Sequence, residues 1–82
     1  MSAIEEVGGW AALLGKVSSG TDLSLNEARA AMRTVLEGEA TSAQIAALVM
    51  GLRTKGESVV ELEGMLAEVR NASARVDLPA EI

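Results

Sequence analysis

Apolar side chains recur along the chain at intervals of three and four residues, the spacing of one face of an α-helix. Four segments carry this pattern, at about residues 9–19, 25–37, 42–55 and 59–72. The positions that we expect to face inward are Trp10, Leu13, Leu14 and Val17, then Ala28, Met32, Val35 and Leu36, then Ile45, Leu48, Val49 and Leu52, and finally Leu62, Met65, Leu66 and Val69. The sequence has no strand pattern and its connections are short. It therefore predicts an all-α fold, a small four-helix orthogonal bundle.

Three of these segments begin with the Ser/Thr-x-x-Glu/Gln pattern of a capping box. In this motif the hydroxyl accepts a hydrogen bond from the backbone N–H three residues later, and the Glu or Gln side chain accepts one from the cap N–H. The motif starts at Ser24, Thr41 and Ser58, so we expect these residues to be helix caps. Gly38 and Gly56 follow the second and third segments, where glycine commonly ends a helix.

The third segment, AQIAALVMGLRTK, is apolar on two sides. At about 100° per residue, Leu48 and Leu52 lie on one side of the helix, and a second, smaller face lies opposite them. That second face consists of Ala43, Ala46, Ala47, Met50 and Thr54. A helix with two apolar faces is typically buried on both, so we expect another domain or subunit to cover the second. The alternative is that these alanines only favour the helical conformation on an exposed face.

Composition narrows the class of protein. A chain of 82 residues permits one small domain, and its core must be aliphatic because Trp10 is the sole aromatic residue. Cys and His are both absent, which excludes disulfides, thiolate chemistry and imidazole bases. A formal net charge of −5 argues against a nucleic-acid partner. Because the sequence shows neither a signal peptide nor a membrane-length apolar run, we expect a cytoplasmic protein without a membrane partner.

Two stretches invite a functional interpretation, and each has a simpler structural one. RTKGES, residues 53–58, could bind a phosphate through its cations and the following helix start. The same letters also describe a helix end, a glycine turn and the cap of the next helix, and we favour that interpretation. Ser24 superficially suggests the phosphopantetheine serine of an acyl carrier protein, but Leu23 separates it from Asp22. No carboxylate has a partner base or a metal-ligand spacing, so we expect no catalytic, cofactor-binding or metal-binding residue in this chain.

From about Leu13 to Pro79 the chain resembles the N-terminal helical domain of anthranilate phosphoribosyltransferases, within the family-3 glycosyltransferase and nucleoside phosphorylase superfamily. The stretches that carry this resemblance are DLSLNEA (22–28), EGEATSAQIAALVMGLRTKGES (37–58), ELEGMLAEVR (61–70) and VDLP (76–79). The resemblance implies a helical domain that precedes an α/β catalytic domain. In the family, a glycine-rich loop of that second domain binds phosphoribosyl pyrophosphate with magnesium, and no matching motif occurs here.

The resemblance also implies a division of the chain and a function. Residues 1–8 would be a flexible N-terminus, 9–74 the helical bundle, and 75–82 a hinge segment leading to the catalytic domain. The full enzyme would transfer phosphoribose to anthranilate in tryptophan biosynthesis, with this domain forming one wall of the interdomain cleft, and we expect the piece alone to be inactive. Two alternatives remain: a free-standing helical interaction module, and the helical domain of a pyrimidine-nucleoside phosphorylase.

Family members associate as homodimers through the first and third helices of this domain. Carried over to this sequence, that property coincides with the second apolar face of the third segment. We therefore predict a dimer interface made of Trp10, Leu13, Ala43, Ala46, Ala47, Met50 and Thr54.

Overall fold

A computed structural model describes residues 3–75, which form five helices and no strand. The helices are α1 (Ala3–Glu6), α2 (Gly9–Ser18), α3 (Leu25–Leu36), α4 (Ser42–Lys55) and α5 (Val59–Arg75). The predicted all-α class is confirmed for these residues. The structure has five helices where four were expected, because the short α1 has no sequence period long enough to recognise. Most of the expected hinge segment, residues 76–82, lies outside the described residues.

Capping boxes start the three longest helices. The Ser24 hydroxyl accepts from the Glu27 N–H at 3.2 Å, and Glu27 accepts in return from the Ser24 N–H at 2.8 Å. Thr41 and Gln44 make the same reciprocal pair at the start of α4. Ser58 and Glu61 make it before α5, at 2.8 and 3.0 Å. At its other end, α4 stops at Gly56, whose φ of 93° lies in the region that favours glycine.

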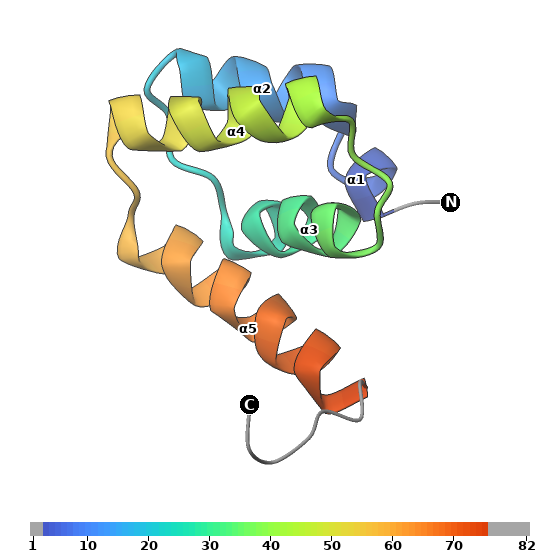
Figure 1. Cartoon of the computed structure of the whole chain (residues 1–82). Helices are drawn as coiled ribbons and strands as arrows, with labels where there is room; N and C mark the ends of the chain where they lie inside the picture. The colour runs from blue at the N-terminus through green and yellow to red at the C-terminus, as the bar shows by residue number, and fades with distance from the viewer. Residues whose placement is uncertain (1–2, 76–82) are drawn as a thin grey trace.

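The helices are arranged as two pairs (Figure 1). α2 packs against α4 in one layer, α3 packs against α5 in the other, and the short α1 contacts both α2 and α3. The α2–α4 contact is close, because a Cβ atom added to Gly51 would lie 2.5 Å from Val17 Cγ1. The α3–α5 contact is close as well, since a Cβ on Gly64 would lie 3.0 Å from both the Ala28 Cβ and the Leu25 carbonyl oxygen.

The core lies between the two layers and is aliphatic. Its buried members are Ile4, Leu13, Val17, Leu23, Ala31, Leu48 and Leu52, with Val7, Trp10, Leu14 and Met65 packed partly against them. The inward positions predicted for the first segment, and Leu48 and Leu52 of the third, are among these residues. Ile4 was not expected here, because residues 1–8 were interpreted as a flexible terminus. Instead α1 contributes a side chain that is 6% exposed.

The inward face predicted for α5 is largely wrong. Leu62, Leu66 and Val69 are 44%, 51% and 40% exposed, and of the four predicted positions only Met65 packs partly against the core. The buried side of α5 carries Glu61, Gly64 and Glu68. The close approach at Gly64 leaves no room for large aliphatic side chains, and the two carboxylates are buried because they have partners on the neighbouring elements. Val49 of α4 and Leu36 of α3 were also expected inside, but are 54% and 44% exposed.

Candidate functional site

The RTKGES turn owes its structure to Lys55. Its ammonium group donates to Asp22 Oδ1, Glu61 Oε1 and the Gly56 carbonyl oxygen, each at 2.8 Å. The Lys55 side chain is only 4% exposed. An ammonium group has three protons, so these three acceptors satisfy it and leave no donor for a phosphate. Burial lowers the pKa of Lys55, but the two carboxylates raise it by more, so the pKa lies above its usual 10.5.

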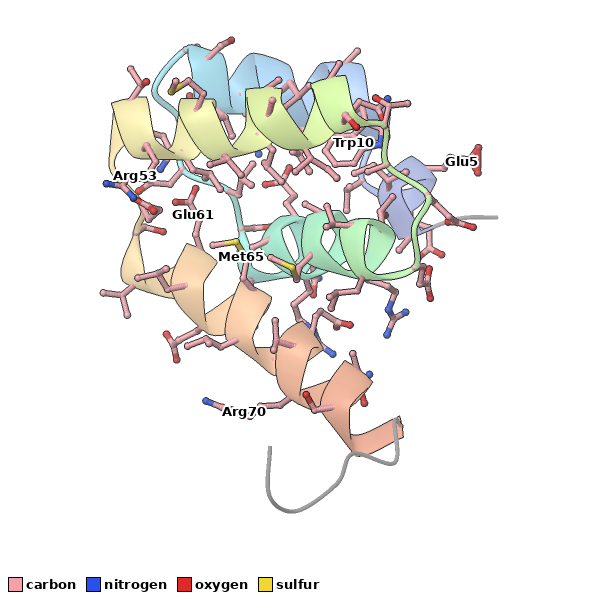
Figure 2. All side chains as sticks on the ribbon, viewed as in Figure 1. Glu5, Trp10, Arg53, Glu61, Met65 and Arg70 are labelled. Atoms are coloured by element: carbon pink, nitrogen blue, oxygen red, sulfur yellow. The ribbon has the colours of Figure 1, made fainter. Side chains whose placement is uncertain are left out.

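Glu61 joins three parts of the chain through one buried carboxylate. Oε2 accepts from the Leu23 N–H at 2.6 Å, while Oε1 accepts from the Ser58 N–H and from Lys55. Figure 2 shows Glu61 and Met65 pointing from α5 toward the other helices. Burial raises the pKa of Glu61, but the N–H group of Leu23 and the charge of Lys55 lower it by more, and the pKa ends below 4.5. This carboxylate is therefore ionised at neutral pH. It attaches α5 to the α2–α3 connection through Leu23 and to the α4–α5 connection through Ser58.

Glu68 makes a second buried attachment of α5, two turns further along. Its carboxylate accepts from Arg29 Nε at 2.9 Å and from Arg33 Nε at 3.3 Å, and its side chain is 2% exposed. Burial raises its pKa and the two guanidinium groups lower it, so that it also lies below the usual value. A concavity of about 360 Å³ opens beside these groups, between α1, α3 and α5. Its lining includes Glu6, Asn26, Arg29, Arg33 and Glu68.

A surface without charged side chains covers the outer side of α4 and part of α2; we call it the α2/α4 face. On α4 it consists of the exposed residues Ala43, Ala46, Ala47, Met50 and Thr54, and on α2 of the exposed Ser18, which lines one concavity with Ala47, Met50 and Thr54. Met50 is the large apolar residue of this set and is 68% exposed. This concavity between the two helices is lined by Val17, Ala47, Met50, Gly51 and Thr54, among others.

Five of the seven residues predicted for the interface lie on this face. The exceptions come from α2. Leu13 is 1% exposed and belongs to the core, so its side chain lines no surface of the chain. Trp10 is half-buried and packs partly against the same core. The reason is that the large residues of α2 point inward, whereas its outward residues are alanine, glycine and serine.

Sequence reasoning missed the two buried carboxylates. Glu61 was recognised only as part of a capping box, and Lys55 only as a cation at a helix end. A usable signal was present for Glu68: Arg29 and Arg33 are four residues apart and so share one helix face, from which both reach the same carboxylate. Complementary charges at these spacings indicate ion pairs between two helices.

Within residues 3–75 no three acidic side chains come together in a way that could hold a metal ion. Among the same residues no helix has the length and apolar character needed to cross a membrane.

Comparison with known families matches residues 11–73 to the helical bundle domain of a glycosyl transferase family. The match covers α3 and α4 in full and all but the first two residues of α2 and the last two of α5, and it includes Lys55, Glu61 and Glu68. The chain belongs to this family. No solved structure matches it.

Three similar curated proteins share the name anthranilate phosphoribosyltransferase. Anthranilate phosphoribosyltransferase of Bradyrhizobium sp. strain BTAi1 is 44% identical over 83% of this chain. The Nitrobacter hamburgensis protein of the same name is 43% identical over 85%, and that of Saccharopolyspora erythraea is 52% identical over 71%. The matched regions are 20%, 21% and 16% of those proteins. The chain thus spans about a fifth of the length of these relatives.

Proposed function

We propose that the chain is the helical domain of an anthranilate phosphoribosyltransferase, and that the full enzyme transfers phosphoribose from phosphoribosyl pyrophosphate to anthranilate. The observation that carries this proposal is the identity of 43–52% to enzymes of that name, over 71–85% of the chain. Since the relatives extend well beyond the matched region, the chemistry belongs to the remainder. The helical domain would supply assembly and one wall of the cleft beside an α/β catalytic domain.

The domain alone is proposed to be inactive. Transfer from a pyrophosphate needs cations to stabilise the charge that develops on the leaving group. Four of the cations among the described residues, Lys16, Arg29, Arg33 and Lys55, are already paired with carboxylates, which leaves the exposed Arg53 on α4 and Arg70 on α5. The test incubates the chain with phosphoribosyl pyrophosphate, anthranilate and magnesium, with a full-length relative as positive control. Turnover by the 82-residue chain would refute this part of the proposal.

Two copies are proposed to associate through the α2/α4 face. Interface centres are depleted in charge, and the exposed small residues of this face permit close approach of two backbones. Met50 provides an apolar side chain that adapts to an imperfect fit. The polar concavity between α1, α3 and α5 lies elsewhere on the domain, and we assign it to the wall of the interdomain cleft, because interfaces between domains are more polar than obligate ones.

Replacement of Met50 by aspartate tests the association. Met50→Asp is expected to lower the sedimentation-derived mass while leaving the circular dichroism spectrum unchanged, because the side chain is 68% exposed and supports no internal contact. Leu36→Asp is the matched control: it introduces the same charge at an exposed apolar position of α3, away from this face. A Met50→Asp protein that associates as strongly as wild type and the control would contradict the proposed interface.

A further inference from the structure

A stripe of apolar residues runs along the solvent side of α5, which we call the α5 seam. Val59, Leu62, Leu66 and Val69 are 73%, 44%, 51% and 40% exposed, and the exposed Ser73 continues the row. The intervals between these residues are three, four, three and four. This is the heptad spacing at which one helix packs along another. A stripe this narrow fits a single helix better than a sheet or a broad domain surface.

None of the seam residues belongs to the buried core. α5 is attached to the bundle through its other side, by Glu61, Glu68 and the close approach at Gly64. Leu66 can therefore change without loss of a core contact. Of the residues labelled in Figure 2, Met65 points into the bundle and Arg70 points away from it.

Charges beside the seam determine what kind of helix fits it. Glu63 and Arg70 are seven residues apart, so both occupy the same edge of the stripe, and both are exposed. Neither makes a side-chain hydrogen bond or ion pair to any residue between 3 and 73. In an antiparallel pair of identical helices, like edges face each other. Glu63 of each copy would then lie beside Arg70 of the other, which gives two symmetric ion pairs.

A parallel pair would lack this complementarity. There, the edge that carries Glu63 and Arg70 faces the opposite edge of the second helix. That opposite edge consists of Ser58, Met65 and Ala72, none of which is charged. The charges therefore favour the antiparallel arrangement.

We propose that the α5 seam binds the α5 seam of a second copy of this chain in an antiparallel, two-fold symmetric pair. Leu66 packs against Val69 of the second copy, and the Glu63–Arg70 ion pairs set the register. The proposal is independent of the enzyme assigned above. α5 lies in the opposite layer from α2 and α4 (Figure 1), so a chain that uses both surfaces assembles beyond a dimer.

The test is a charge exchange made in the Met50→Asp protein, so that the α2/α4 face cannot contribute. The reference protein is expected to dimerise weakly in sedimentation equilibrium, because a seam of five residues is smaller than the roughly 800 Å² per partner of a standard interface. Glu63→Arg alone and Arg70→Glu alone each turn two attractive pairs into repulsive ones. Each is expected to weaken the dimer about tenfold. The double exchange, Glu63→Arg with Arg70→Glu, restores the pairs and the affinity.

Two further measurements keep the result unambiguous. Leu66→Asp in the same background should abolish the dimer with an unchanged circular dichroism spectrum. The proposal is overturned if the Met50→Asp protein is monomeric at every concentration, or if the double exchange fails to recover what the single changes lose. It is also overturned if the catalytic portion of a related transferase, added separately, binds the seam while the chain alone stays monomeric. Each of these outcomes leaves the test of the α2/α4 face unaffected.

Discussion

In the α2–α4 pair the contact is made by aliphatic side chains and a glycine, whereas in the α3–α5 pair it is made by buried carboxylates and a glycine. Leu13, Val17, Leu48 and Leu52 belong to the first contact region and to the core beneath it. Glu68 belongs to the second and accepts from Arg29 and Arg33 of α3. Glu61, on the same side of α5, accepts from the Leu23 N–H just before α3 and from Lys55 of α4. Both pairs approach closely, so the difference is one of chemistry rather than of spacing.

This difference has consequences for stability. An aliphatic contact loses free energy in proportion to the volume removed, and its neighbours relax partly into the gap. Removal of a buried carboxylate with three donors costs more free energy, because it leaves buried donors without partners. We therefore expect the most damaging single substitution to be a polar one.

The largest effect is expected from Glu61→Ala. The change leaves the Leu23 N–H without its carboxylate and deprives the buried Lys55 of one of its three acceptors. Removing one partner of a buried charge pair costs about 3–5 kcal/mol, a large share of the stability of a small domain. Urea unfolding followed by circular dichroism measures it.

The control for Glu61→Ala is Glu63→Ala, two residues later on the exposed side of α5. A surface substitution of this kind should change the free energy of unfolding by no more than about 0.5 kcal/mol. Equal losses for the two variants would show that the Glu61 contacts contribute nothing beyond those of an ordinary surface glutamate.

In the aliphatic pair, Leu48→Ala is expected to cost about 2–5 kcal/mol, because Leu48 is 3% exposed and its truncation leaves a cavity. Val49→Ala, at a neighbouring position that is 54% exposed, is the control and should cost much less. The same urea titration applies. If Leu48→Ala were as stable as Val49→Ala, the aliphatic contacts of the α2–α4 pair would contribute little to the free energy of unfolding.

The two pairs also differ in how far the sequence predicts them. Periodicity predicts most of the α2–α4 pair: Leu13, Val17, Leu48 and Leu52 are buried as expected, whereas Val49 is exposed. Periodicity fails for α5. It assigns the inward face to the most apolar stripe of a helix, and in α5 that stripe contains Leu62 and Leu66, which are exposed. Hydropathy scores each residue alone, so it cannot show that a carboxylate with hydrogen-bond and ion-pair partners is stable in the interior.

In the candidate site, too, the sequence predicts what depends on one helix and misses what depends on contacts between elements. The small residues around Met50 are found from one helix alone, because a second apolar face is visible in the spacing. The contribution of Ser18 depends on which side of α2 meets α4, which is a tertiary property. Lys55 was explained by local helix-end chemistry, yet its partner Asp22 comes from the α2–α3 connection and its partner Glu61 from α5.

Acid should affect the α3–α5 pair more than the α2–α4 pair. The pKa values of Glu61 and Glu68 are lower in the folded chain than their usual 4.5, so unfolding takes up protons. Their contribution to stability is therefore complete above about pH 4.5 and is lost as pH falls through the lowered values. Unfolding free energies measured by urea titration from pH 7 to pH 3 should fall. In Glu68→Gln the fall should be shallower, and an unchanged slope would contradict the assignment.

The smallest expected effect compares the same capping-box position in the two layers. Gln44 closes the box of α4 as Glu61 closes that of α5, but its hydrogen-bond partners are confined to Thr41. Gln44→Ala therefore removes one local hydrogen bond at a helix start and should cost about 1 kcal/mol or less. If Gln44→Ala proved as costly as Glu61→Ala in the same titration, the boxes themselves would hold the helices in place. The distant donors to Glu61, the Leu23 N–H and Lys55, would then add little, and the contrast between the two pairs would disappear.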